Sequence, residues 1–378
     1  MKEIYFNNAA TSYPKPKCVA DAVLECINKG NVSPINYADN MISEARKKIS
    51  TFFGSKNNNV VFTKSVTESA NLVLNGLFKE GDHIISTQMD HNAVIRPLQN
   101  LKKTRGIEFS LASCDSDGYI CLFTLEKLIK DNTKAIVLTH ASNVCGTILP
   151  IREIGEICKK HGILLIVDTA QTAGLIPINM EEDGIDILMF TGHKWLMGLE
   201  GVGGIVFNGD IYKEINPLIY GGTGLSPELD TMPEELPQKF EGGTRNTTGI
   251  CSLSASIDYI NSIGQDELLK AGRKLKKLFI DNLKGVKGIE IIGYNEFVAS
   301  VPIVSLKLEK TKSKDLAEFL EARYNIISKP GLQCSPSSHK ALGTFPNGTI
   351  RFSFNHFNTE EEVLFTCDKI KEFMANQD

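Results

Sequence analysis

The chain contains 378 residues, of which 42% are hydrophobic and 23% are charged, and it carries a formal net charge of −4 at pH 7. This length predicts one large core with a smaller second unit, and the composition is typical of an ordinary soluble globular protein. The negative net charge argues against a nucleic-acid surface built on bulk positive charge. Partners are therefore expected to be small molecules or proteins, with no nucleic acid among them.

The sequence also lacks the patterns of export and of metal binding. Met1 is followed quickly by charged and polar residues, and no apolar run has the length of a signal peptide or a membrane span. We therefore expect a cytoplasmic protein with no membrane partner. The nine cysteines form no CxxC pair and no Cys/His ligand pattern, which predicts neither a disulfide framework nor a metal site.

In the first half of the chain, short apolar runs alternate with amphipathic patterns. Strands are predicted at residues 60–62, 83–87, 134–139 and 163–167, and helices at residues 68–77, 92–103 and 151–160. This order favours an α/β fold with a mostly parallel sheet that is covered by helices on both faces. Ligands of such folds bind where the strands end.

The pattern changes in the second half of the chain. A long helical stretch is predicted at residues 252–283, and it is followed by strands at 301–306 and 349–354 and by helices at 313–324 and 359–374. These elements predict a compact α+β unit. We place the domain boundary inside the long helix, which gives a large domain of residues 15–260 and a small one of residues 261–378, with residues 1–14 packing near the latter.

One long stretch is expected to lack helices and strands. Residues 217–245 are rich in proline and glycine, and they lie inside the predicted large domain. Loops of this length in compact domains usually serve a function. We therefore interpret the stretch as a functional loop and not as a linker.

Asp168 follows the predicted strand at residues 163–167, and Gln171 comes three residues later. An acid at a strand end of an α/β protein faces the ligand side, where its carboxylate suits a buried cation such as the protonated nitrogen of a pyridine ring. The alternative is that Asp168 caps the helical segment after it.

Lys194 lies where an apolar strand pattern runs directly into polar residues, next to His193. A lysine cation is costly to bury, so a lysine held at such a strand end can lose its proton and become a nucleophilic amine that forms an imine. The alternative is an exposed loop lysine, the commonest environment of this residue type.

The segment around Lys194 resembles the Schiff-base segment of class V aminotransferases, the fold-type I pyridoxal-phosphate group that contains cysteine desulfurases and selenocysteine lyases. Further segments resemble the motifs of this family in the same order along almost the whole chain. They are Asn7-Asn-Ala-Ala-Thr-Ser, Thr67-Glu-Ser-Ala-Asn, Asp90-His-Asn-Ala-Val, Ala141-Ser-Asn-Val-Cys-Gly-Thr and Val167-Asp-Thr-Ala-Gln. The resemblance implies a large sheet domain and a smaller C-terminal α+β domain that carries a cysteine loop and a substrate arginine.

The resemblance also implies pyridoxal 5'-phosphate as the cofactor, held as a Schiff base by Lys194. Asp168 would pair with the pyridine nitrogen, Gln171 would contact the ring hydroxyl and His91 would stack on the ring. Thr191 and His193 would bind the phosphate. The other residues implied for cofactor binding are Val66, Thr67, Asn143 and Thr244, and those implied for substrate binding are Asn7, Ala9, Asn143 and Arg351.

Thr244 lies in the segment Glu241-Gly-Gly-Thr-Arg-Asn. This segment is similar to one in which a threonine of the family reaches the phosphate of the neighbouring subunit, so the resemblance implies a homodimer. The alternative is a glycine-rich surface turn.

Cys334 lies in the segment Lys329-Pro-Gly-Leu-Gln-Cys-Ser-Pro, away from any apolar run. The segment resembles the sulfur-accepting loop of desulfurases, whose usual pattern is Arg-x-Gly-x-His-Cys-Ala. It departs from that pattern at Lys329, Gln333 and Ser335. Cys334 would act as a thiolate if nearby positive charge lowers its pKa, whereas the alternative is an inert loop thiol. Buried structural thiols are expected instead at Cys158, Cys251 and Cys367.

Arg351 is predicted to lie on the strand at residues 349–354. Arginine binds a carboxylate bidentately, and the resemblance places Arg351 on the α-carboxylate of the substrate. An ordinary ion pair is the alternative. His339, between Cys334 and Arg351, resembles a histidine of one branch of the family, and it is otherwise a loop residue.

The sequence thus predicts an enzyme that converts L-cysteine to L-alanine while its sulfur passes to Cys334 as a persulfide, with Lys194 moving the α-proton. A separate sulfur-acceptor protein is a possible further partner. The short interval between Cys334 and Arg351 favours the branch with a restrained cysteine loop, which includes selenocysteine lyases. The alternatives are a selenocysteine lyase, another C–S lyase or aminotransferase that does not use Cys334, and a noncatalytic sulfur carrier.

Overall fold

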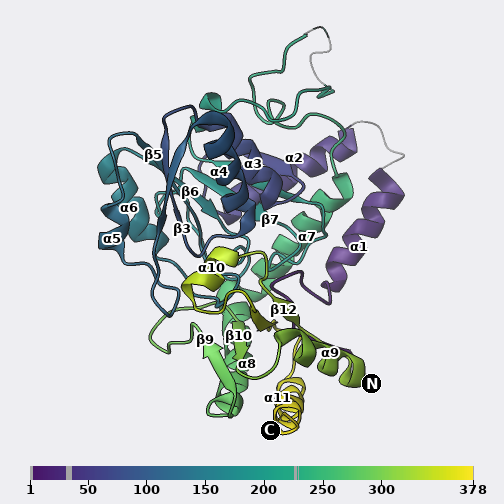
Figure 1. Ribbon diagram of the computed structural model, residues 1–378. Helices are drawn as coiled ribbons and strands as arrows, with labels where there is room; N and C mark the ends of the chain where they lie inside the picture. The colour runs from purple at the N-terminus through teal and green to yellow at the C-terminus, as the bar shows by residue number, and fades with distance from the viewer. Residues whose placement is uncertain (1–2, 31–35, 225–227, 229, 378) are drawn as a thin grey trace.

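The structure is a computed structural model that describes residues 3–30, 36–224, 228 and 230–377. Figure 1 shows two parts, a larger one built on a twisted sheet and a smaller one that carries α11 and lies near both ends of the chain. The larger part contains α1 to α7, and the smaller part contains the helices and strands from β9 on.

The larger sheet has seven strands in the order β2-β8-β7-β6-β5-β3-β4. The five strands from β7 to β4 are parallel, whereas β8 runs antiparallel to both of its neighbours. The predicted mostly parallel sheet is therefore confirmed. The strands span β2 Val60–Thr63, β3 His83–Thr87, β4 Glu108–Ala112, β5 Thr133–Thr139, β6 Leu164–Asp168, β7 Ile187–Thr191 and β8 Gly203–Phe207.

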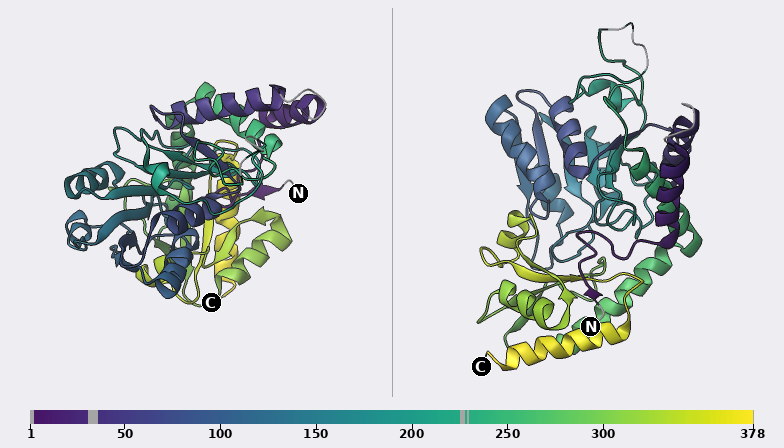
Figure 2. Two further views of the ribbon diagram at one scale, coloured as in Figure 1. Left: turned by 90° about the horizontal axis from the view of Figure 1, so that it is seen from above. Right: turned by 90° about the vertical axis from the view of Figure 1, so that its right-hand side faces the viewer.

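Helices cover both faces of this sheet because successive strand residues point to opposite sides. Ile84 and Ile166 pack with α3 and α4, whereas Ile85 and Val167 pack with α2, α6 and α7. Figure 2 shows α1 and α2 along the outer side of α7. The helices span α1 Lys17–Glu25, α2 Asn36–Phe52, α3 Val66–Leu77, α4 Asn92–Arg105, α5 Leu122–Glu126, α6 Ile151–His161 and α7 Thr247–Ile263, with a π turn at Cys26–Gly30 and a 3-10 turn at Ile211–Glu214.

The smaller part is built on an antiparallel sheet in the order β12-β13-β10-β9. Its core also takes in Ile4 and Phe6, and β1 pairs with β11. The elements span α8 Gln265–Leu283, β9 Ile289–Ile292, β10 Ile303–Leu308, α9 Ser313–Tyr324, β11 Ile326–Ile327, β12 Lys329–Gly331, α10 Pro336–Ala341, β13 Thr349–Ser353 and α11 Glu360–Ala375, with β1 at Ile4–Tyr5.

The prediction of one long helix at residues 252–283 is wrong at Gly264. This residue has a φ of 94°, which is not helical, and it separates α7 from α8. Leu268 and Leu269 of α8 pack in the core of the larger part, whereas Leu275 packs in the smaller core. Because α8 belongs to both cores, a domain boundary at residues 260–261 remains a prediction.

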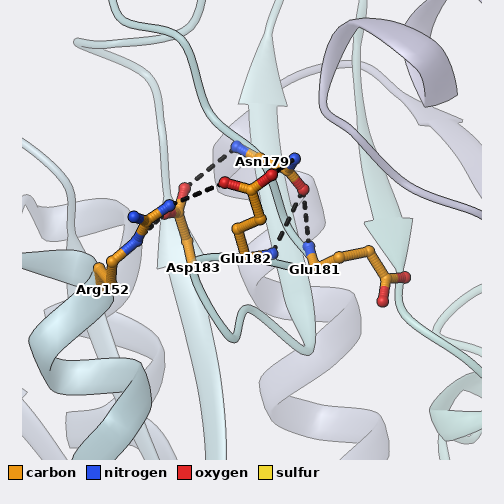
Figure 3. Close-up of polar contacts among 5 residues, drawn as sticks. All are labelled: Arg152, Asn179, Glu181, Glu182 and Asp183. Carbon is orange, nitrogen blue, oxygen red and sulfur yellow. Dashed lines mark hydrogen bonds and ion pairs between the residues drawn. The ribbon is translucent and has the colours of Figure 1, made fainter.

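The turn between β6 and β7 is held by a group of polar side chains (Figure 3). Asn179 accepts hydrogen bonds from the amides of Glu181 and Glu182, and its own amide donates to Asp183 at 3.0 Å. Arg152 of α6 reaches across to both Glu182 and Asp183. These contacts fix the turn that leads into β7, the strand directly before Lys194.

Residues 217–245 contain no helix or strand in the part that the structure describes; residues 225–227 and 229 of the predicted functional loop lie outside it. A buried ion pair between Arg46 and Glu241 holds the end of this loop. Arg46 also donates to the carbonyl of Val60 at 2.6 Å, and Glu241 accepts from the amide of Phe62 at 2.7 Å. The ion pair therefore ties the loop that carries Thr244 to α2 and β2.

We predict that Arg46→Met lowers the free energy of unfolding by about 3–5 kcal/mol, because Glu241 is left as a buried charge without its partner. Urea denaturation followed by circular dichroism measures the effect. Arg152→Met is the matched control: it removes an arginine from the exposed ion pairs of Figure 3 and should leave the midpoint nearly unchanged. Equal midpoints for the two variants would contradict the structural role of the Arg46 pair.

Candidate active site

A pocket lies at the edge of the larger sheet where the parallel strands β5, β6 and β7 end. Thr139 pairs with Asp168 across neighbouring strands, and β7 ends next to them at Thr191. Nine residues that the sequence singled out line this pocket: Val66, Thr67, His91, Asn143, Asp168, Gln171, Thr191, His193 and Lys194.

Lys194 lies half-buried on the loop after β7. Burial lowers the pKa of its amine to about 8, with Asp168 opposing this shift, Arg351 adding to it and Cys334 opposing it. Asp168, Arg351 and Cys334 are therefore close enough to Lys194 to act on its amine electrostatically. A larger fraction of this amine is neutral at a given pH than for an ordinary lysine.

The N-terminal segment holds the loop of Lys194 in place. The carbonyl of His193 accepts hydrogen bonds from the amide of Ser12 at 3.0 Å, from Oγ1 of Thr11 at 3.1 Å and from Nζ of Lys15 at 2.8 Å. Oγ of Ser12 donates to the same carbonyl at 3.2 Å, and together these donors fix the main chain directly before Lys194.

A glycine on the other side of this loop permits close approach. Gly174 has a φ of 99°, and a Cβ atom there would overlap the carbonyl of Trp195. Any larger residue would therefore displace the backbone directly after Lys194.

Asp168 is buried at the end of β6, as predicted, and its Oδ1 accepts from the amide of Ala170 at 2.8 Å. Burial raises the pKa of its carboxyl, while that amide and Lys194 oppose the shift. A buried carboxylate with little compensation is stabilised by a cationic ligand. Gln171 lies beside it and bonds to the indole of Trp195 at 2.9 Å and to the carbonyl of Ala9 at 3.1 Å.

His91 is the N-cap of α4, and its Nδ1 accepts from the amide of Ala93 at 3.0 Å. Burial, together with the positive charges of Lys194, Arg351 and Arg96, lowers its pKa to about 4. The ring is therefore neutral near pH 7, and because Nδ1 accepts, its proton resides on Nε2.

The pocket also contains unpartnered polar atoms beside a helix N-terminus. Oγ1 of Thr191 and Nδ1 of His193 are buried and have no hydrogen-bond partner among the described residues. Val66 and Thr67 begin α3, whose first amides lack intrahelical partners and attract anions. These donors fit a phosphate group, and the carboxylate of Asp168 fits a protonated ring nitrogen. The residues present therefore fit pyridoxal phosphate.

Arg351 lies on β13, buried behind the pocket. Its Nη1 donates to the carbonyl of Asn143 at 2.9 Å and its Nη2 to Oδ1 of Asn7 at 3.3 Å, whereas Nε is buried without a partner. Among the residues that the structure describes, no carboxylate pairs with this guanidinium. Burial lowers its pKa to about 10. The ordinary ion pair is therefore not found, and a bound carboxylate would suit the site.

Cys334 is exposed on the turn between β12 and α10. It lines a surface groove together with His91, Asn92 and Arg96. Its thiol lies close enough to Lys194 to affect the pKa of that amine. The structure therefore brings the cysteine turn of the smaller part to the Lys194 pocket of the larger part.

Two candidates lie away from the pocket. Thr244 is exposed in a separate hollow with Glu241 and Arg245. His339 is buried on α10 and bonds to Gln333 and Thr344, so the alternative that it is a loop residue is wrong, whereas a role in the site stays a prediction. The cysteines expected to be buried, Cys158, Cys251 and Cys367, are buried.

Sequence reasoning missed three residues that shape the pocket. Ser65 caps α3 and Thr139 ends β5, and both line the pocket. Asp90 is buried and accepts from Ser86 and from the amide and hydroxyl of Thr87, which fixes the turn before His91. A serine before an amphipathic pattern is a helix-start signal that would have identified Ser65. The partners of Asp90 carry no comparable signal.

The described residues contain neither a membrane-spanning helix nor a cluster of metal ligands. No helix among them is both long enough and apolar enough to cross a membrane. No group of three or more His, Cys, Asp or Glu side chains within the same residues is placed to hold a metal ion.

Comparisons with known proteins give the family of this chain. Residues 4–365 match the family described as aminotransferase class-V. A probable cysteine desulfurase of Pyrococcus abyssi is 34% identical over 95% of this chain and 91% of that protein. Another, from Methanothermobacter thermautotrophicus, is 30% identical over 98% of this chain and 95% of that protein.

Solved structures show the same similarity. The apo structure of a cysteine desulfurase from Thermococcus onnurineus NA1 has a TM-score of 0.92 and 32% identity, covering 99% of this chain and 95% of that chain. A cysteine desulfurase from Escherichia coli has a TM-score of 0.90 at 23% identity, which supports the fold alone. On the full-length match to the family and to these relatives, the chain belongs to the cysteine desulfurase family of class-V aminotransferases.

Proposed function

We propose that this protein is a pyridoxal-phosphate enzyme that converts L-cysteine to L-alanine and transfers the sulfur to Cys334. The observation that carries the proposal is the environment of Lys194, whose amine lies within electrostatic reach of Asp168, Arg351 and Cys334. These groups supply an amine, a partner for a ring nitrogen, a carboxylate anchor and a sulfur acceptor in one place.

The chain's own residues would divide the work as follows. Lys194, Thr191 and His193 hold the cofactor, with the amides of Val66 and Thr67 at its phosphate and Asp168 at its ring nitrogen. When bound, the cofactor supplies the electron sink that makes the α-proton of an amino acid acidic. Lys194 is placed to accept and return that proton.

Arg351 orients the substrate through its carboxylate. Asn7 and Asn143 hold the guanidinium from two sides, and its free Nε faces no competing partner among the described residues. A two-point contact between a guanidinium and a carboxylate fixes direction as well as position. The side chain of the substrate is thereby directed to one place in the site.

Cys334 completes the reaction as a thiolate that attacks the substrate sulfur. A bond forms between that sulfur and Sγ of Cys334, the carbon–sulfur bond of the substrate breaks, and its electron pair stays on the carbon, which takes up a proton. One cysteine and one protein thiol thus give alanine and a protein persulfide without an outside oxidant. Selenocysteine would react in the same way.

The remaining parts of the proposal concern assembly and location. Thr244 lies outside the Lys194 pocket on an exposed loop, which supports contact with the phosphate site of a second copy in a homodimer. All nine cysteines are free, which supports a reducing cytoplasm. The exposed position of Cys334 supports passage of the persulfide sulfur to an acceptor protein.

We predict that Lys194 of the cofactor-free protein reacts with amine reagents with an apparent pKa of about 8, because its burial disfavours the charged form. Reductive methylation at several pH values, followed by peptide mass spectrometry, gives this value. Asp168→Asn should move the curve to lower pH, since the carboxylate favours the ammonium form. Lys17, whose pKa is raised by Asp21, is the internal control and should react only at higher pH.

The same peptide map tests the cofactor assignment. Borohydride treatment of the cofactor-loaded protein should fix the cofactor covalently on the peptide that contains Lys194. Label on another lysine would overturn the central role of Lys194.

We expect Cys334→Ala to reduce alanine formation from L-cysteine by about two orders of magnitude or more, because the attacking sulfur is lost. Alanine, sulfide and selenide are measured with L-cysteine and L-selenocysteine, with a thiol reductant present. Cys121→Ala, which removes another exposed cysteine, should keep the wild-type rate. Full-rate desulfuration by the Cys334 variant would rule out its role as acceptor, and pyruvate with ammonia would indicate β-elimination.

We expect Arg351→Met to raise the KM for L-cysteine at least about tenfold, since a charge-assisted hydrogen bond to the carboxylate is lost. The sharper measurement is the ratio of rates with L-cysteine and with cysteamine, which has no carboxylate. This preference should disappear in the variant and persist in the exposed control Arg323→Met. If Arg351→Met kept the wild-type preference for L-cysteine over cysteamine, Arg351 would not bind the substrate carboxylate.

A further inference from the structure

The turn that carries Cys334 has an unfavourable backbone conformation. Gln333 and Cys334 are consecutive residues with positive φ, at 41° and 58°. Residues with a Cβ atom rarely adopt this left-handed region, and two in succession are rarer. The surrounding structure must therefore hold this turn against its local preference.

On one side, the side chain of Asn143 holds both neighbours of Cys334. Its Nδ2 donates to the carbonyl of Gln333 at 2.8 Å, and its Oδ1 accepts from Oγ of Ser335 at 2.7 Å. Both Asn143 and Ser335 are buried, so water does not readily replace a lost bond. One amide thus fixes the chain directly before and directly after the cysteine.

On the other side of the turn, the side-chain amide of Gln333 forms hydrogen bonds at both its nitrogen and its oxygen. Its Nε2 donates to the carbonyls of Lys329 at 3.1 Å and Thr349 at 3.0 Å, so its Oε1 is the acceptor that faces Nε2 of His339 at 2.8 Å. Nδ1 of His339 then accepts from Thr344. Burial lowers the pKa of His339 to about 4, which keeps the ring in the neutral form that this arrangement requires.

A third contact fixes the cysteine itself. The amide of Asn92, the first residue of α4, donates to the carbonyl of Cys334 at 2.9 Å. A helix N-terminus leaves such amides without intrahelical partners, and this one is satisfied by the turn. The cysteine turn of the smaller part is therefore joined to α4 of the larger part.

We propose that Ser335 and Gln333 are positioning residues, which hold the thiol of Cys334 toward the Lys194 pocket, Ser335 through Asn143 and Gln333 through His339. The inference rests on the function proposed for Cys334. Alanine, the usual residue at the Ser335 position of similar loops, has no hydroxyl and could not bond to Asn143. The departures of this chain from the usual pattern therefore create the contacts that hold the turn.

The first test compares Ser335→Ala with Ser338→Ala in the cofactor-loaded protein. Ser338 is also buried at this end of α10, but its hydroxyl bonds to the carbonyl of Gln88 at 3.1 Å and not to Asn143. For Ser335→Ala we expect kcat for alanine formation to fall about fivefold or more, with KM for L-cysteine within about twofold of wild type. The control should keep both constants within about twofold.

The second measurement does not depend on turnover. A turn that has lost one of its two bonds to Asn143 lets the thiol rotate further toward solvent, so a bulky maleimide should label Cys334 at least about threefold faster in Ser335→Ala than in Ser338→Ala. Mass spectrometry of the Cys334 peptide gives this rate. Gln333→Asn, which tolerates positive φ but is too short to reach His339, should show the same increase and provides a second variant.

The outcomes separate this inference from the proposed function. Equal kcat and equal labelling rates in Ser335→Ala, Gln333→Asn and the Ser338 control would overturn the positioning role. A wild-type protein that forms no alanine from any substrate would overturn the proposed function, while the labelling rates would still decide whether Ser335 and Gln333 hold the turn.

Discussion

The site depends on the cost of placing the charge of Lys194 at the end of a buried strand. Its amine has lost part of its water, and the negative charges of Asp168 and Cys334 partly offset that loss, while Arg351 opposes the positive charge. A lysine left free would turn toward solvent. The donors that the N-terminal segment gives to the carbonyl of His193 prevent this, because they fix the backbone one residue earlier.

The two parts of the molecule meet at Asn143. Its main-chain carbonyl accepts from Arg351 of the smaller sheet, and its side chain bonds on both sides of Cys334. The proposed carboxylate anchor and the proposed sulfur acceptor are thus located relative to one residue of the larger part. A shift of Asn143 would move Arg351 and Cys334 together. The distance between the proposed carboxylate anchor and the proposed sulfur acceptor would then stay constant.

The sequence predicted the layers of the fold because the strand pattern and the helix pattern are both local. Alternate residues of buried strands face opposite helices, and the helix patterns repeat over ten or more residues. It failed at Gly264, where the amphipathic pattern continues through a residue whose backbone is not helical. The pocket residues were found through motifs, and the structure brings nine of them together, although their roles remain predictions.

Contacts between distant residues could not be predicted in this way. Ser335 and Asn143 are 192 positions apart, and neither residue type signals the other. The same holds for Asp90, which accepts from neighbours in the chain but is recognised only once Thr139 of the next strand is seen to face it. The loop alternative for His339 also fails, because this residue lies on α10, a short helix that begins at Pro336, and proline is well suited to the first turn of a helix.

Gln333 also limits which group can take the proton of Cys334. An amide does not titrate near neutral pH, and both ends of this one are occupied by Lys329, Thr349 and His339. His91 shares the groove of Cys334, but its Nδ1 is occupied by a helix amide and its Nε2 carries the proton. Lys194 is the remaining neighbour whose neutral form is well populated near pH 8. In the proposed reaction Lys194 handles the proton of the substrate, whereas Cys334 is exposed and can release its own proton to solvent as well as to this amine.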